Sequence, residues 1–289
     1  MSTVEQVTEP VAAHGEGPVW FAGWPGPRWV DMLAGDVLEL AGGRVRRTHV
    51  GTVAAALRPR SDGGAVLALE RGFALADASL AKVESLPELW TDREIRMNDG
   101  GCDPDGRFYC GSMAYSAAPG AGGLYRLEAD GSVTTVLTGV TVSNGLAWSP
   151  DGGTAYYIDT PTQRVDAFDY SAERGLTARR PLIEIPADAG APDGMTVDAE
   201  GRLWIALWGG GAVRCYTPDG KLAEHVPLPV TQVTACAFGG PDLDELYITT
   251  SRQTIDPAAQ PEAGALFRYR PGVRGLPVLG YAVSANRVT

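Results

Sequence analysis

Four polar residues occupy the same position in a repeated pattern along this sequence. Each one begins a short apolar stretch, and a turn follows seven residues later. The four residues are Glu16, Asn98, Asn144 and Asp193. Their carboxylate and amide oxygens are ligands that hard divalent cations prefer, so the pattern predicts a metal site. Asn-Gly and Asp-Gly pairs are also common in turns, but unrelated turns would not share one offset.

Strand-like runs follow these turns and recur elsewhere in the chain, six in all. They begin at residues 28, 65, 107, 155, 203 and 246. Intervals of roughly 40 residues are typical of four-stranded propeller blades. We therefore predict an all-β fold, a six-bladed β-propeller of four-stranded antiparallel blades, in a single domain over residues 1–289. The segment before Glu16 is expected to pair with residues 265–269 in the last blade, because this closure hides exposed sheet edges.

In a propeller, residues at equivalent positions of the sequence repeat come close together in space. The innermost strand of each blade runs along the central channel, so residues at equivalent positions point to one axis. The other two blades place alanine there, Ala55 and Ala235 in our alignment. Four polar groups and two small ones leave one side of the channel open to a substrate.

Composition limits the possible partners. The net charge of -11 argues against nucleic acid as a partner in electrostatic terms and favours divalent cations or neutral ligands. Residues 1–10 contain Glu5 and Glu9 and no apolar core, so we expect no signal peptide. No 18 apolar residues run together, so we expect no membrane partner and a cytoplasmic location. The chain is expected to be a monomer or a weak homo-oligomer.

Other catalytic chemistries have little support in the sequence. The four cysteines, Cys102, Cys110, Cys215 and Cys236, lack zinc-site spacing and are interpreted as reduced, buried thiols. The three histidines lie in separate blades without a ligand pair, and neither a P-loop nor a G-x-S-x-G nucleophile turn occurs.

Several stretches together carry a family resemblance. They include Glu16-Gly17-Pro18-Val19-Trp20, Arg96-Met97-Asn98-Asp99-Gly100, Val142-Ser143-Asn144-Gly145-Leu146-Ala147-Trp148, Pro192-Asp193-Gly194-Met195 and Pro261-Glu262-Ala263-Gly264. Each motif alone is weak, but their order over nearly the whole chain is specific. The sequence resembles the senescence-marker-protein, gluconolactonase and luciferin-regenerating-enzyme family, whose animal member is regucalcin.

The resemblance implies a function and assigns residues to it. It implies one divalent ion, among calcium, zinc, manganese, iron and magnesium, and hydrolysis of a small-molecule sugar lactone. It implies Glu16, Asn144 and Asp193 as metal ligands, with Arg96 and Asn98 facing the substrate. Relatives that act on gluconolactone can carry acidic residues after a Gly-Thr-Met-Ala stretch, whereas Gly111-Ser112-Met113-Ala114 is followed here by Tyr115-Ser116. Tyr115 is therefore predicted to line a pocket rim that differs from theirs.

These groups suggest a reaction and leave alternatives open. A cation held by two carboxylates and an amide polarises the lactone carbonyl and acidifies a water molecule. Asp193 is the predicted proton acceptor, in addition to its role as a ligand. Trp208 is a candidate pocket wall or a packing residue. The same site suits a hydrolase of phosphotriesters or organofluorophosphates, and a non-enzymatic calcium-binding propeller is the third possibility.

Overall fold

The computed structural model describes residues 3–283; Met1, Ser2 and residues 284–289 lie outside the described part. Within residues 3–283, twenty-four strands form six four-stranded sheets, and every strand pair within the sheets is antiparallel. The predicted six-bladed propeller is confirmed.

The sheets follow the chain order, and we number the blades accordingly. Blade 1 contains β2 (Gly15–Val19), β3 (Arg28–Asp31), β4 (Asp36–Ala41) and β5 (Arg44–His49). Blade 2 contains β6 (Ala54–Pro59), β7 (Ala65–Leu69), β8 (Phe73–Ala76) and β9 (Val83–Ser85). Blade 3 contains β10 (Ile95–Cys102), β11 (Phe108–Ala114), β12 (Gly122–Leu127) and β13 (Val133–Val140).

The second half repeats the same plan. Blade 4 contains β14 (Ser143–Trp148), β15 (Thr154–Asp159), β16 (Arg164–Ser171) and β17 (Gly175–Glu184). Blade 5 contains β18 (Ala191–Val197), β19 (Leu203–Trp208), β20 (Ala212–Tyr216) and β21 (Leu222–Pro227). Blade 6 contains β22 (Val233–Gly239), β23 (Glu245–Thr250), β24 (Phe267–Tyr269) and β1 (Glu5–Gln6). Three short 3-10 turns occur, η1 (Met32–Ala34), η2 (Thr160–Thr162) and η3 (Ala187–Ala189).

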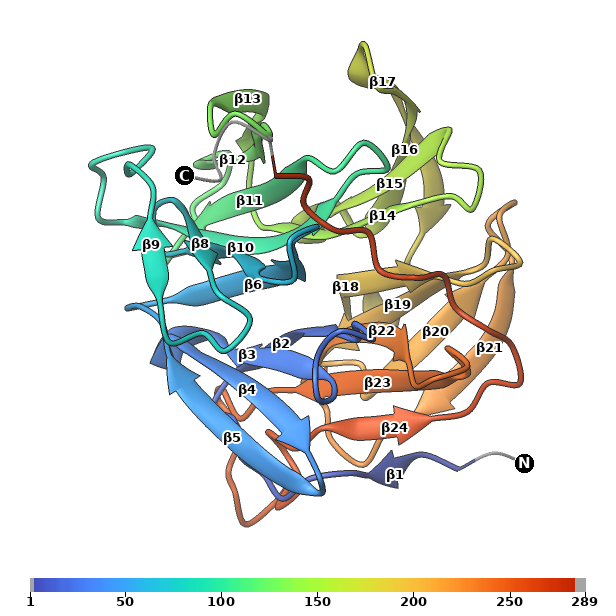
Figure 1. Ribbon diagram of the computed structural model, residues 1–289. Coiled ribbons are helices and arrows are strands. Elements are labelled where there is room, and N and C mark those ends of the chain that lie inside the picture. Colours follow the sequence, from blue (N-terminus) through green and yellow to red (C-terminus); the bar gives the residue numbers. More distant parts are fainter. Residues whose placement is uncertain (1–2, 284–289) are drawn as a thin grey trace.

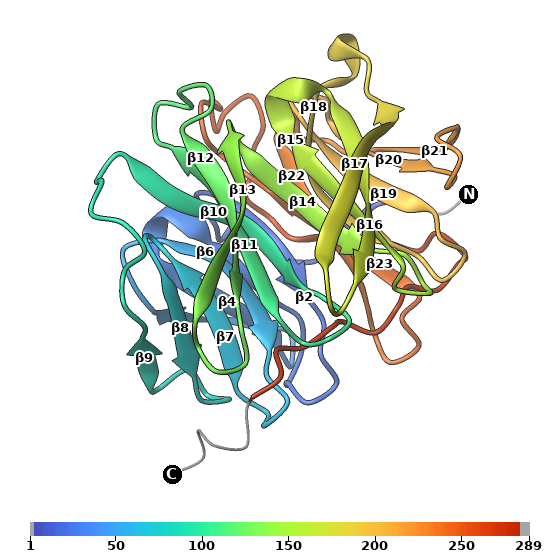
Figure 2. The same cartoon turned by 90° about the horizontal axis from the view of Figure 1, so that it is seen from above.

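The six blades are arranged in a ring around a central axis (Figure 1). The innermost strands β2, β6, β10, β14, β18 and β22 contact one another in cyclic order, and β22 contacts β2. Neighbouring sheets pack face against face, as β10–β13 and β14–β17 do in both views (Figure 1 and Figure 2). Aromatic pairs fill the layers between blades: the ring centroids of Phe73 and Phe108 are 5.7 Å apart, and those of Trp204 and Phe238 are 5.9 Å apart.

The N-terminal segment closes the ring, as predicted. Strand β1 pairs with β24 through Glu5 opposite Arg268, and the Val7 amide donates to the Leu266 carbonyl at 2.8 Å. Blade 6 is thus built from both ends of the chain. This pairing covers the edge of β24 and joins the first blade to the last.

The C-terminal segment after β24 crosses one end of the channel (Figure 1). The Gly275 amide donates to the Leu243 carbonyl in blade 6, and the Tyr281 amide donates to the Pro59 carbonyl in blade 2, both at 2.8 Å. We call residues 275–282 the strap. The four cysteines are free and buried, as predicted. No helix among residues 3–283 is long and apolar enough to cross a membrane.

Candidate functional site

The polar residues lie in bulged strands, not in turns. The pairing register of every innermost strand breaks once, and in β10, β14 and β18 the break contains Asn98, Asn144 and Asp193. In β2 the break begins at Glu16. A bulge bends the strand and changes the direction of its side chains, so the common offset reflects one bulge per blade. The interpretation of these windows as ordinary turns is therefore wrong.

Close packing at the axis explains the glycine after each polar residue in β14 and β18. A Cβ on Gly145 would lie 2.9 Å from the Asp193 carbonyl oxygen. A Cβ on Gly194 would lie 2.5 Å from the Cβ of Ala235. Neighbouring innermost strands meet at these points, so a larger residue would push them apart. The Asn-Gly and Asp-Gly pairs serve this close approach.

One predicted channel position is wrong by one residue. Trp148, four residues after Asn144, lies opposite Ala155, which begins the second strand-like run of blade 4. In blade 6 the second strand-like run begins at Leu246, which lies opposite Phe238. Thr234 is four residues before Phe238, so Thr234 is equivalent to Asn144, and Ala235 is equivalent to Gly145. The Thr234 hydroxyl donates to the Gly15 carbonyl at 2.6 Å and is fully buried. We call Glu16, Ala55, Asn98, Asn144, Asp193 and Thr234 the inner ring.

Hydrogen bonds connect three of the predicted site residues. Arg96 donates through Nη1 to Asn98 Oδ1 at 2.7 Å, and Asn98 Nδ2 donates to Asn144 Oδ1 at 3.1 Å. Asn144 Nδ2 donates to the Thr160 hydroxyl at 2.8 Å, and that hydroxyl donates to the Pro192 carbonyl, also at 2.8 Å. The chain of bonds fixes each amide and ends beside Asp193. The structure therefore brings together Arg96, Asn98 and Asn144 from two blades.

Three buried carboxyl groups influence one another at the axis. Burial raises the pKa of Glu16 well above its usual value, and the charges of Asp193 and Asp99 raise it further. Burial raises the pKa of Asp193 as well, and Asp99 adds to this effect. Asp99, also buried, is a functional candidate that the sequence interpretation missed, although it adjoins Asn98. Carboxylates this close are costly in a low-dielectric site unless a cation balances them.

A second set of residues surrounds the inner ring. In each blade the second strand runs antiparallel to the innermost one, so its end lies at the start of the innermost strand. The residues there, which we call the outer ring, are Met32, Glu70, Tyr115, Thr160, Trp208 and Ser251. They contact the inner strands: Met32 Sδ lies 3.1 Å from Arg96 Nη1, and Thr160 bonds Asn144. In the sequence, these residues could have been found by their position directly after, or at the end of, the second strand of each blade.

His14 is buried beside Glu16, a proximity that the sequence interpretation also missed. Its Nε2 lies 3.8 Å from Glu16 Oε1, and its Nδ1 lies 2.8 Å from the Ser251 hydroxyl oxygen. Burial, and next the charge of Arg96, lower the pKa of His14 to about 4. The ring is therefore neutral at pH 7. Trp208 packs against it edge to face, with the ring centroids 5.8 Å apart, which places Trp208 at the same end of the channel.

Tyr115 lies at the rim, next to Arg96. Its ring centroid is 5.7 Å from Arg96 Cζ, and its hydroxyl donates to Glu70 Oε1 at 2.7 Å. Tyr115 is 44% exposed, in contrast to the buried inner-ring residues. The rim residue of blade 3 thus interacts with a carboxylate from blade 2.

Comparison with known proteins agrees with this fold. The family model described as "SMP-30/Gluconolactonase/LRE-like region" matches residues 14–252. Regucalcin from Danio rerio is 36% identical over 288 residues, which cover 96% of this chain and 98% of the relative. The chain belongs to this SMP-30/gluconolactonase/LRE-like family.

Solved structures of similar proteins share the whole architecture. A luciferin-regenerating enzyme is 30% identical with a TM-score of 0.91, covering 98% of this chain and 100% of that chain. A calcium-binding protein, regucalcin, from Agrobacterium tumefaciens is 30% identical with a TM-score of 0.89, covering 97% of each chain. The family resemblance and the fold that it implies are confirmed.

The donor set meets the requirements of a divalent cation. Among residues 3–283, no three His, Cys, Asp or Glu side chains are arranged to hold a metal. The candidate ligand set differs from such a cluster, because it combines the two carboxylates of Glu16 and Asp193 with the amide oxygen of Asn144. Hard cations accept such oxygen ligands, and a divalent charge balances two carboxylates. The chemistry of the donors therefore fits a divalent cation.

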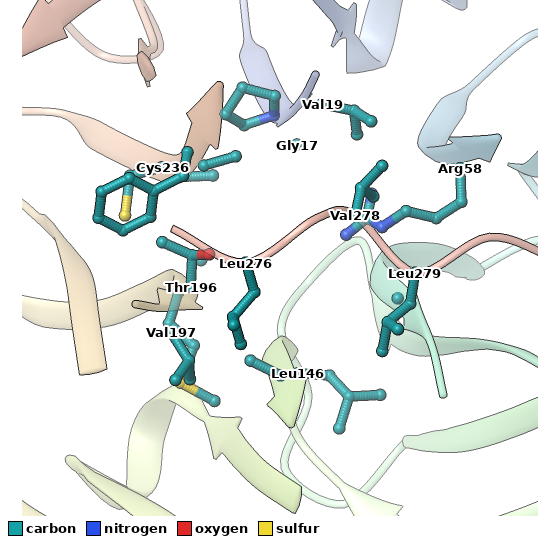
Figure 3. A pocket seen from close by; sticks show the side chains of 18 of the residues that line it. Gly17, Val19, Arg58, Leu146, Thr196, Val197, Cys236, Leu276, Val278 and Leu279 are labelled. Carbon is teal, nitrogen blue, oxygen red and sulfur yellow. The ribbon is translucent and has the colours of Figure 1, made fainter. Parts of the chain in front are cut away.

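The strap lies over the far end of the channel. A cavity of about 130 Å³ begins beside Gly17, Asp99 and Gly194 and extends along the innermost strands away from the outer ring. Figure 3 shows the strap passing over this cavity with Leu276, Val278 and Leu279. The strap covers this end with apolar side chains.

Proposed function

We propose that this chain hydrolyses sugar-acid lactones with one divalent cation held by Glu16, Asn144 and Asp193. The observation that carries the proposal is the burial of Glu16 and Asp193 within mutual electrostatic influence, beside the bonded Arg96, Asn98 and Asn144. Membership of a family named after a gluconolactonase supports the reaction. The similarity to a calcium-binding regucalcin of known structure supports the cation.

The cation, when bound, supplies a Lewis acid that polarises the carbonyl and makes a nearby water more acidic. Asp193 accepts a proton from the attacking water, whose oxygen bonds to the carbonyl carbon. The ring C–O bond then breaks, and the ring oxygen takes a proton to become a hydroxyl, so the product is an open hydroxy acid. The burial of Asp193 at the start of the β18 bulge supports this role.

Arg96 and Asn98 position the substrate in this scheme. Arg96 keeps its guanidinium at the axis through its bond to Asn98 Oδ1. The guanidinium donates to the carbonyl oxygen as negative charge develops there, or to ring hydroxyls. Asn98 is held by Ser143 and Asn144, so it orients Arg96.

A lactone panel on metal-stripped protein tests the proposal. Hydrolysis of D-glucono-1,5-lactone, followed with a pH indicator, is expected to vanish after exhaustive chelation and to return with one of calcium, zinc, manganese, iron or magnesium. Full activity in stripped protein would refute the metal role. Hydrolysis of a paraoxon-like ester but of no lactone would favour the phosphotriester reaction. Stoichiometric calcium binding without any hydrolysis would favour a calcium-binding propeller.

Two variants separate the roles within the site. Asp193→Asn keeps the size of the side chain but removes its basicity, so turnover should fall by a factor on the order of 10² or more. Arg96→Ala should weaken lactone hydrolysis while metal content, measured by atomic emission, stays at the wild-type level. Near-wild-type turnover in metal-loaded Asp193→Asn would remove Asp193 from catalysis. Metal loss in Arg96→Ala would make its segment structural.

A further inference from the structure

A directional chain of hydrogen bonds runs from blade 3 to blade 5 through the candidate metal ligand Asn144. It starts at the Arg96 guanidinium, which can only donate, and passes through Asn98 to the Asn144 oxygen. Asn144 Nδ2 donates to the Thr160 hydroxyl, and that hydroxyl donates to the Pro192 carbonyl, which can only accept; both distances are 2.8 Å. Because one end is a pure donor and the other a pure acceptor, each bond in the chain has one direction.

The Thr160 hydroxyl determines which end of the Asn144 amide faces it. A hydroxyl group has one proton, and the Pro192 carbonyl receives it, so the Thr160 oxygen meets Asn144 as an acceptor. An amide oxygen in that place would face lone pairs with no proton between them, so the amide nitrogen is held there. The Asn144 oxygen therefore points the other way. Asn98 donates to one of its two lone pairs, and the second remains for a cation.

The backbone keeps Thr160 in this place. Thr160 begins the short turn η2 directly after β15, and its amide donates to the Val142 carbonyl at 3.0 Å. Pro161 follows and restricts the backbone of the turn. The acceptor of the hydroxyl proton, the Pro192 carbonyl, belongs to the backbone of β18 and directly precedes Asp193. Neither partner of the turn depends on a mobile side chain.

We propose that Thr160 is a positioning residue that holds the Asn144 amide with its oxygen toward the cation. This inference rests on the proposed function, because it specifies how the chain presents one ligand of that site. The amide oxygen is the negative end of the group and binds hard cations, whereas the NH2 end would repel them. Loss of a partner that orients a metal ligand weakens metal binding about 10–100-fold.

Calorimetric titration of metal-stripped protein tests the proposal, with calcium, manganese, zinc and magnesium chlorides in turn. Thr160→Val keeps the shape of the side chain but removes the hydroxyl, so the Kd of the ion that binds should rise at least about tenfold. Thr160→Ser retains the hydroxyl and should keep that Kd within about threefold of wild type. Failure of Thr160→Ser to bind better than Thr160→Val would overturn the proposal, because the methyl group would then be the part that matters.

Thr162→Val is the matched control. Thr162 lies in the same turn, is half-buried like Thr160, and donates to the Asp159 carbonyl at 2.7 Å. Each valine variant loses a bond from a hydroxyl to a carbonyl, so the melting temperature of metal-free protein should fall in both. Only Thr160→Val should weaken metal binding. An equal weakening in the two variants would overturn the proposal, because the turn as a whole would then support the site.

A second background isolates the orientation of the amide. Asn144→Asp replaces the amide by a carboxylate, whose two oxygens are both acceptors, so either can face the cation. In that background, adding Thr160→Val should change the Kd by less than about twofold, because the two substitutions act on the same interaction. A further loss of about tenfold there would overturn the proposal, because the hydroxyl would then act without the amide.

The metal titration also separates this inference from the proposed reaction. A Kd that rises in Thr160→Val and is restored in Thr160→Ser supports the inference, even if no lactone is hydrolysed and the reaction fails. Lactone hydrolysis by wild type, together with equal Kd values in wild type and Thr160→Val, overturns the inference and leaves the reaction intact. Absence of binding of all four ions by wild type overturns both the inference and the metal role in the proposed function.

Discussion

Replacing Asp193 by asparagine should stabilise the metal-free protein at alkaline pH. Burial, and next the charge of Asp99, raise the pKa of Asp193 in the folded protein. A carboxyl group whose pKa is higher in the folded than in the unfolded protein makes the fold less stable as pH rises. The loss of stability begins above the unfolded-state pKa, near 3.9, and is complete above the folded-state pKa. At pH 8 the ionisation of Asp193 therefore lowers the stability of metal-free wild type, whereas Asp193→Asn has no such loss. The raised pKa of Glu16 adds to this loss, partly through the Asp193 charge.

The size of the effect follows from linkage. Each unit by which the folded pKa is raised costs about 1.4 kcal/mol once both states are ionised. For a chain of 289 residues, 1 kcal/mol changes Tm by about 2 °C. Asp193→Asn should therefore melt above wild type in chelator at pH 8, by about 3 °C for each unit by which folding raises the pKa of Asp193. The difference should shrink toward zero as pH falls to about 4.

Differential scanning calorimetry in chelator over pH 4 to 8 measures this difference. Glu173→Gln is the matched control, because Glu173 is exposed and its loss should leave the curve unchanged. With a divalent cation present, wild type should gain more in Tm than Asp193→Asn, since the variant has lost one ligand charge. A variant that melts at or below the wild-type temperature in chelator at every pH would refute the electrostatic reasoning.

Three further predictions concern the ring of strands. Deleting residues 2–12 removes β1 and exposes the edge of β24, so Tm should fall and aggregation by light scattering should rise; an unchanged melting curve would contradict the role of this closure. Gly194→Ala places a Cβ 2.5 Å from that of Ala235 and should cost about 1–3 kcal/mol in urea unfolding, whereas a Cβ at the control position, Gly153→Ala, has its nearest neighbour 3.6 Å away and no such clash. Thr234→Val removes the donor to the Gly15 carbonyl and should cost about 1 kcal/mol; a stability equal to wild type would show that this bond is dispensable.

Local patterns were sufficient to predict the blades and most of the inner ring. Strand runs, turns and the polar residue before each apolar stretch are all contained in short windows, and Glu16, Asn98, Asn144 and Asp193 fall in equivalent strand bulges. Thr234 was missed because the local likeness of Val142-Ser143 to Val233-Thr234 suggests a register one residue away from the true one. Only the pairing of β22 with β23 fixes that register.

Contacts between blades could not be predicted in this way. Glu70 and Tyr115 are 45 residues apart in sequence, and His14 meets Ser251 across the closure of the ring. Asp99 adjoins a predicted residue, but its electrostatic effect on Glu16 and Asp193 depends on where three innermost strands meet. These contacts between blades depend on the radius of the ring and on the order of the blades around it. No short segment of the sequence specifies either.

The two rings face different physical constraints. Inner-ring residues sit where strands approach within contact distance, as Gly145 and Gly194 demonstrate, so a change of size there disturbs neighbouring blades. Outer-ring residues lie where a second strand ends, and Tyr115 can project into solvent without altering any strand pairing. Substitution of Tyr115 can therefore change the exposed group at the rim at little structural cost. Substitution of Glu16 or Asp193 in the inner ring changes the charge that is buried at the axis.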